Sequence, residues 1–170
     1  MDCTLTSMTS IVYFLSQKKY KIEDIYNYTE KIAKKYLYVG TKGTPFVTIR
    51  KIFHKVLNKF GLPKAYVKYG KNFGYNFDSI VAEINKGNPL ILTMNNDGRN
   101  YYENHSVTAV GYAVFRVGDY KIRLIKVYDN WRKIISYVDY EKMSTISTIH
   151  YSGLTFRQKH QMWKQLKNLK

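Results

Sequence analysis

Apolar residues near the start of the chain recur every three or four positions, which is the spacing of one helix face. The stripe consists of Leu5, Met8, Ile11, Val12, Phe14 and Leu15. We therefore expect a buried helix from about Thr4 to Gln17, with Cys3 on its first turn.

Two further helices are predicted by their end signals. The stretch from Ile22 to Tyr38 is acidic at its start and basic near its end, as the helix dipole favours. The next helix has Thr44 as its expected cap, Pro45 in its first turn and Gly61 after its last residue. Three helices thus precede the first predicted strand.

The pattern then changes from helix to strand. Ala65–Tyr69 is a short predicted strand, and a short helix from Phe77 to about Ile84 ends before Gly87. The later apolar runs are rich in β-branched and aromatic residues, which is typical of strands. They predict strands at Leu90–Met94, His105–Phe115, Tyr120–Tyr128, Lys133–Val138 and Thr145–Tyr151, with a hairpin turn at Val117–Asp119.

Helices first and antiparallel strands later predict an α+β domain, with N-terminal helices packed on a C-terminal antiparallel sheet. We place this domain at residues 1–155 and interpret 156–170 as a basic tail that forms a short helix. A chain of 170 residues fits such a domain and can bury a sizeable core.

Charge and hydropathy narrow the possible partners. No run approaches the roughly 18 apolar residues that span a bilayer, and no signal peptide is visible. The net charge of +16 comes largely from lysines spread along the chain, without an arginine cluster or a basic–aromatic stripe. We therefore expect no specific nucleic-acid binding, but a loose affinity for anionic surfaces.

Three residues have the chemistry of an activated thiol nucleophile. Cys3 is the single cysteine and lies at a predicted helix start, where main-chain N–H groups favour a thiolate. His105 begins one strand and Asp129 follows a later one. A thiol needs a base to take its proton, and the base needs a partner that fixes its tautomer. The order predicts nucleophile, base and orienter, and the alternative is that Cys3 and His105 are buried structural residues.

The residues around His105 and Asp129 resemble a known family. Asn104–Tyr112, which reads Asn-His-Ser-Val-Thr-Ala-Val-Gly-Tyr, is similar to the papain-family segment His-Ala-Val-x-x-Val-Gly-Tyr around the catalytic histidine. Asp129, Asn130 and Trp131 resemble that family's Asn-Ser-Trp, and an aspartate at the first position looks more like the C39-type branch.

The resemblance implies a papain-like cysteine peptidase fold. It implies that Cys3, His105 and Asp129 form a catalytic triad that cleaves peptide bonds through a thioester acyl-enzyme. Asn130 is the alternative orienter. Trp131 is expected either to shield the pair from water or simply to pack in the core.

The resemblance also implies an oxyanion-hole glutamine a few residues before the cysteine, but only two residues precede Cys3. Either the sequence lacks its natural N-terminus, or the Cys3 N–H acts with another donor. The polar loop Asn95–Asn104 directly precedes His105 and is expected to be a rim of the cleft or an ordinary connection.

The expected partner is a peptide or protein substrate. No cofactor or metal is expected, because His54, His150 and His160 show no metal-ligand spacing. The alternative function is a non-catalytic domain of the same fold whose basic surface binds an acidic partner. We favour a bacterial protein that is secreted or held at the cell envelope over a cytoplasmic one.

Overall fold

The computed structural model describes residues 2–40, 43–63, 65–69, 76–94, 102, 104–143 and 148–152. The predicted tail 156–170 and most of the loop 95–104 lie outside these residues. The helices are α1 (Cys3–Leu15), α2 (Ile22–Lys34), α3 (Phe46–Lys59) and α4 (Phe77–Asn85). The strands are β1 (Ala65–Tyr69), β2 (Leu90–Met94), β3 (His105–Val117), β4 (Tyr120–Tyr128), β5 (Ile135–Asp139) and β6 (Thr148–Ser152). Within the described residues, no helix combines the length and the apolarity that crossing a membrane requires.

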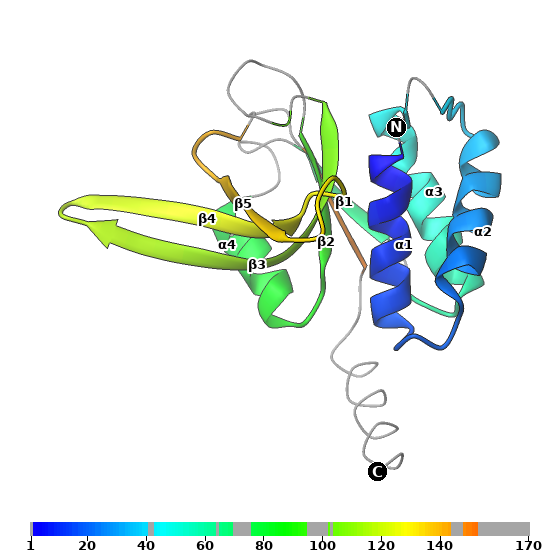
Figure 1. Ribbon diagram of the computed structural model, residues 1–170, viewed down its shortest axis with the longest axis horizontal. Coiled ribbons are helices and arrows are strands. Elements are labelled where there is room, and N and C mark those ends of the chain that lie inside the picture. The colour runs from blue at the N-terminus through cyan, green and yellow to red at the C-terminus, as the bar shows by residue number, and fades with distance from the viewer. Residues whose placement is uncertain are drawn as a thin grey trace, which may run out of the picture.

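The predicted α+β architecture is confirmed. The six strands form one antiparallel sheet in the order β1-β6-β2-β3-β4-β5. Helices α1, α2 and α3 form a layer at one side of the sheet, where α1 contacts β2 and β3 and α3 contacts β1 and β6 (Figure 1). Helix α4 packs against β2 and β3 from the other face.

Strand β2 separates two apolar cores, because its side chains alternate between the faces of the sheet. Ile91 packs among the residues of α1, α2 and α3. Leu90 and Leu92 point the other way, into a cluster with Phe77 and Ile80 of α4. Burial of each large apolar side chain stabilises the fold by about 1.5–3 kcal/mol, so β2 fixes both layers to the sheet.

Most predicted element ends lie within a few residues of the observed ones, and the exceptions have local causes. Helix α2 ends at Lys34 instead of Tyr38, and Leu37 has a left-handed φ of 63°. At α3, Pro45 instead of Thr44 occupies the cap position. Gly61 ends α3 as predicted, with a φ of 70° and a hydrogen bond from the Leu62 N–H to the carbonyl of Leu57.

The contact of α1 with β3 positions the candidate site. It joins the start of α1, where Cys3 lies, to the start of β3, where His105 lies. Strand β4 pairs with β3 and ends at Tyr128, so Asp129 follows directly beside them. The fold therefore brings together residues that lie more than a hundred positions apart in the sequence.

Candidate active site

Cys3 is the first residue of α1, and its partly buried thiol interacts with the side chain of His105. Burial alone would raise the pKa of the thiol. The interaction with the His105 side chain, a main-chain hydrogen bond at Ser106 and the charge of His105 act against burial and hold the pKa of Cys3 below its usual value. Cys3 is therefore a thiol whose surroundings favour the thiolate.

The imidazole of His105 is almost fully buried and fixed from one side. Its Nε2 lies 2.6 Å from the main-chain oxygen of Asp129. A carbonyl oxygen can only accept, so Nε2 has the proton and Nδ1 of the neutral ring is the free base. Nδ1 is buried and meets the criteria for a hydrogen bond with none of the described residues, so it is the ring nitrogen left for the thiol of Cys3.

The surroundings of His105 also shift its pKa. Burial lowers the pKa of the ring, but the thiol of Cys3 and the main-chain oxygen and charge of Asp129 raise it by more. The pKa of His105 therefore lies above its usual value while the pKa of Cys3 lies below its own. The two values approach each other, which enlarges the population of a thiolate–imidazolium pair.

The carboxylate of Asp129 is fully buried and accepts hydrogen bonds from its own turn. The N–H groups of Trp131 and Arg132 donate to it at 3.1 and 3.0 Å, the Ser136 hydroxyl at 2.9 Å and the Tyr102 hydroxyl at 3.3 Å. The Arg132 guanidinium lies 3.1 Å away. Burial would raise the pKa of this carboxyl, but these donors lower it to about 2.

The part of Asp129 that contacts the imidazole differs from the expectation. The motif predicts that the carboxylate accepts the hydrogen bond of His105, whereas the main-chain carbonyl accepts it. The physical reason is that donors of the turn already surround both carboxylate oxygens. The carboxylate thus holds the turn in shape, and the turn presents its carbonyl to the ring.

Asn130, the alternative orienter, makes no hydrogen bond to the imidazole among the described residues. Its amide Nδ2 instead lies 3.1 Å from the carbonyl oxygen of Cys3, 2.9 Å from the Ser7 hydroxyl and 3.1 Å from the carbonyl oxygen of Ser106. Asn130 also has a φ of 64°, which asparagine tolerates better than most residues. One amide therefore joins Cys3 to Ser106, the strand residue that follows His105.

A row of hydroxyl groups crosses the same seam between α1 and the sheet. The Thr4 and Ser106 hydroxyls lie 2.8 Å apart, and the Ser106 and Thr93 hydroxyls 3.0 Å apart. All three residues are buried. These residues were not predicted as part of the site, although small polar residues within apolar strands indicate such a contact.

Two aromatic rings enclose the imidazole of His105. The ring of Trp131 lies 4.2 Å from it between centroids, and the ring of Tyr102 stacks at 5.5 Å. Trp131 is 46% exposed, so it lies at the surface beside the imidazole and does not belong to the buried core. Tyr102 was not predicted as a site residue, but it lies in the polar loop expected at the rim of the cleft.

The first turn of α1 is left without its usual carboxylate cap. Asp2 occupies the cap position, yet its side chain makes no cap hydrogen bond. The Tyr26 hydroxyl donates to one of its oxygens at 2.6 Å and the Tyr38 hydroxyl donates to the other, and these bonds lower the pKa of Asp2. The first N–H groups of a helix have no partner within the helix, so they stay available to an anion at Cys3.

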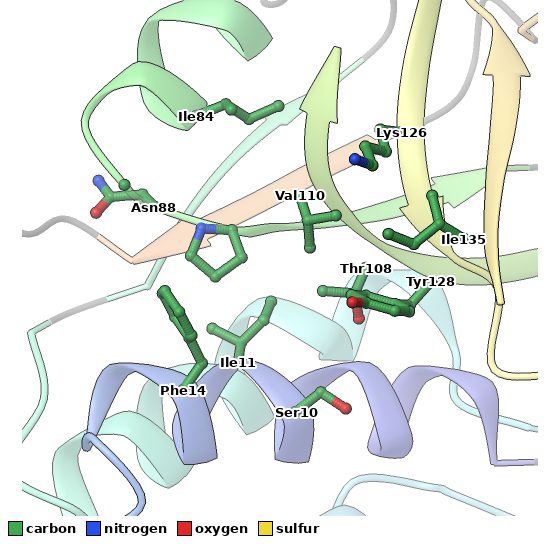
Figure 2. A pocket seen from close by; sticks show the side chains of 12 residues that line it. Ser10, Ile11, Phe14, Ile84, Asn88, Thr108, Val110, Lys126, Tyr128 and Ile135 are labelled. Carbon is green, nitrogen blue, oxygen red and sulfur yellow. The ribbon is translucent and has the colours of Figure 1, made fainter. Parts of the chain in front are cut away.

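A cavity of about 420 Å³ lies further along α1 and is separate from the Cys3–His105 pair. Ile11 and Phe14 of α1 line it on one side and Val110 and Tyr128 of the sheet on the other (Figure 2). None of the predicted catalytic residues lines this cavity. Among the described residues there is also no group of three or more His, Cys, Asp or Glu side chains that could hold a metal ion.

Comparison with known protein families gives a match over nearly the whole chain. No curated protein matches the sequence at a significant level. The model of the Peptidase_C39 like family matches residues 2–168, which is nearly the whole chain and includes every residue of the site. The chain therefore belongs to the Peptidase_C39 like family, within the superfamily of papain-like cysteine peptidases.

Proposed function

We propose that this protein is a cysteine peptidase in which Cys3 is the nucleophile and His105 the general base and acid. The observation that supports this most directly is the contact of the two side chains, together with the opposite shifts of their pKa values. Opposite shifts of this kind are what a thiol nucleophile needs near neutral pH. Family membership supports a peptide or protein as the substrate.

The reaction follows from the assigned atoms. Nδ1 of His105 takes the thiol proton of Cys3, and Sγ attacks the carbonyl carbon of a peptide bond. A carbon–sulfur bond forms as the π bond of the carbonyl opens to an oxyanion. His105 gives its Nδ1 proton to the leaving amine as the carbon–nitrogen bond breaks, which leaves a thioester. A water molecule then attacks the thioester and gives a proton to Nδ1. The carboxylic acid leaves, and the thiol–imidazole pair is restored.

Two neighbours position these groups without reacting. The main-chain carbonyl of Asp129 keeps the proton on Nε2, so that Nδ1 faces the thiol with a free lone pair. The amide of Asn130 holds the start of α1 against β3. We assign Trp131 to the exclusion of water from the imidazole, which strengthens the interaction of thiolate and imidazolium.

We assign the oxyanion of the tetrahedral intermediate to the uncapped first turn of α1. The N–H of Cys3 itself is the nearest such donor, and the positive end of the helix adds to it. Removal of one oxyanion donor costs about 10²–10³ in rate in known enzymes.

Alkylation by iodoacetamide and labelling by a thiol-directed peptidase inhibitor test this proposal, because Cys3 is the single cysteine and labelling needs no known substrate. We expect alkylation at mildly acidic pH, well below the free-thiol pKa of about 8.5. His105→Ala should move the alkylation profile up to that value. Cys3→Ala and His105→Ala should also abolish cleavage of a peptide library by the folded protein, as judged by circular dichroism.

The alternative function, a non-catalytic binding domain, predicts the opposite result. In that case alkylation would begin only near the free-thiol pKa, His105→Ala would not change it, and no peptide would be cleaved. Cleavage that survives both substitutions would place the chemistry elsewhere.

A further inference from the structure

Strands β3 and β4 continue beyond the rest of the sheet. The pairing of β2 with β3 ends at Ala109, and the pairing of β5 with β4 ends at Leu124. Arg123 still contacts residues outside the two strands, because its guanidinium lies over the rings of Phe77 and Tyr140. Beyond this point residues 115–122 form a two-stranded ribbon that projects from the molecule (Figure 1).

One face of the ribbon is apolar and open to solvent. Residues directly opposite in an antiparallel pair share a face, and the pairs here are Phe115 with Ile122 and Val117 with Tyr120. Their side chains are 53%, 38%, 61% and 78% exposed in that order. We call these four residues the apolar face. An isolated two-stranded ribbon is marginally stable in water, and a contiguous exposed apolar patch marks an interaction site.

The opposite face of the ribbon is basic. Arg116 and Lys121 lie directly opposite each other, and like charges in this position repel. Neither forms an ion pair with a described residue, and Asp119 in the turn is the single acid of the ribbon. We call Arg116 and Lys121 the basic face. In the part of the chain that the structure describes, no anion pairs with these two cations to relieve their repulsion.

We propose that the ribbon is a contact element for an anionic lipid surface. A bilayer surface has an apolar layer directly beneath a layer of phosphates, and a ribbon with one apolar and one basic face matches both layers at once. The net charge of +16 attracts the whole molecule to such a surface. The same charge repels a second copy of the chain, which argues against self-association through the apolar face. This inference does not depend on the proposed peptidase activity.

Co-sedimentation of the full chain with vesicles tests the proposal. One set consists of phosphatidylcholine alone and the other of equal parts phosphatidylcholine and phosphatidylglycerol. We expect binding to the anionic vesicles and not to the neutral ones. Phe115→Ser combined with Tyr120→Ser should weaken this binding at least about tenfold, and Arg116→Gln with Lys121→Gln should weaken it by a similar factor.

Matched variants outside the ribbon serve as controls. Tyr137→Ser removes a 53% exposed aromatic ring from β5, and Lys51→Gln with Lys55→Gln removes two exposed lysines from α3. Both should bind anionic vesicles nearly as well as the parent chain. The rate of Cys3 alkylation, measured in every variant, reports whether the body of the protein is unchanged.

Two results would overturn the proposal. In the first, Phe115→Ser with Tyr120→Ser binds as the parent does, and loss of two cations weakens binding equally in the ribbon and in α3. The attraction is then a general effect of charge, and the ribbon has no part in it. If the chain does not bind vesicles but forms dimers or captures an acidic protein through the apolar face, the face is a protein interface. Light scattering of the parent and of the Phe115→Ser, Tyr120→Ser variant distinguishes these cases.

Discussion

The amide of Asn130 leads to a prediction about stability. Substitution by glycine removes its hydrogen bonds, and substitution by alanine adds the strain of the left-handed backbone. The Nδ2 group has two hydrogens for three acceptors at 2.9–3.1 Å, so its removal deletes about two hydrogen bonds. At about 0.5–1.5 kcal/mol each, Asn130→Gly should lower the free energy of unfolding by about 1–3 kcal/mol. Asn130→Ala should lower it by roughly 1 kcal/mol more, because alanine disfavours the φ of 64°.

Loss of the Asn130 amide should also lower the reactivity of the Cys3 thiol by more than the lower stability of the fold explains. Without the amide, the start of α1 is no longer tied to the carbonyl of Ser106, so Cys3 and His105 can separate. A displacement of about 1 Å can cost on the order of 10²-fold in rate, and we expect this loss in kcat with little change in KM. The pKa of Cys3 should rise toward that of a free thiol as its interaction with His105 weakens.

Urea unfolding and the pH profile of alkylation measure the two effects separately. Ser7→Ala is the matched control, because it removes one acceptor of the same amide and leaves both carbonyl contacts. It should cost less than about 1.5 kcal/mol and leave the alkylation profile unchanged. If Asn130→Gly destabilises the protein but keeps the alkylation profile of the parent, Asn130 is a structural residue and the positioning argument is wrong.

Three further outcomes are expected. Tyr26→Phe with Tyr38→Phe removes the two hydroxyls that lower the pKa of the Asp2 carboxyl, so an NMR titration of this carboxyl should show a higher pKa than in the parent. The carboxyl of Asp129 has its pKa lowered to about 2, so its stabilisation is present above the unfolded value of about 3.9 and is lost as the pH falls toward 2. Urea unfolding at a series of acidic pH values should therefore show a shallower loss of stability in Asp129→Asn than in the parent. Binding to DNA or RNA, measured by fluorescence anisotropy, should be independent of sequence and fall steeply with salt, and tight sequence-selective binding would contradict the charge argument.

The elements of the fold were predictable where local periodicity decides them. The strands Leu90–Met94 and Tyr120–Tyr128 have the predicted bounds, because alternation and β-branched composition act within a few residues. The end of α2 was not predictable, since the left-handed Leu37 is neither glycine nor asparagine. The cap of α3 was assigned to Thr44 from residue type, and residue type alone does not fix which position has the first helical N–H.

The sequence could predict which side chains the candidate site brings together, but it could not predict the contacts that hold them. The chain has one cysteine and four histidines, so a thiol at a helix start and a histidine at a strand start can be recognised in the sequence. The acceptor for His105 is a main-chain carbonyl, and every residue has one. The sequence pointed to Asp129 through its carboxylate, although that carboxylate acts on its own turn.

The seam between α1 and the sheet explains why its polar residues escape sequence reasoning. A buried hydroxyl or amide costs free energy unless it has a partner, so Thr4, Ser106 and Asn130 are stable where they are because the fold brings their partners to them. Those partners come from the opposite end of the sequence and share no periodicity with them. Cys3, the proposed nucleophile, lies on the α1 side of this seam, and His105, the proposed base, lies on the side of the sheet. A substitution in the seam should therefore change the distance between Cys3 and His105 before it changes the fold.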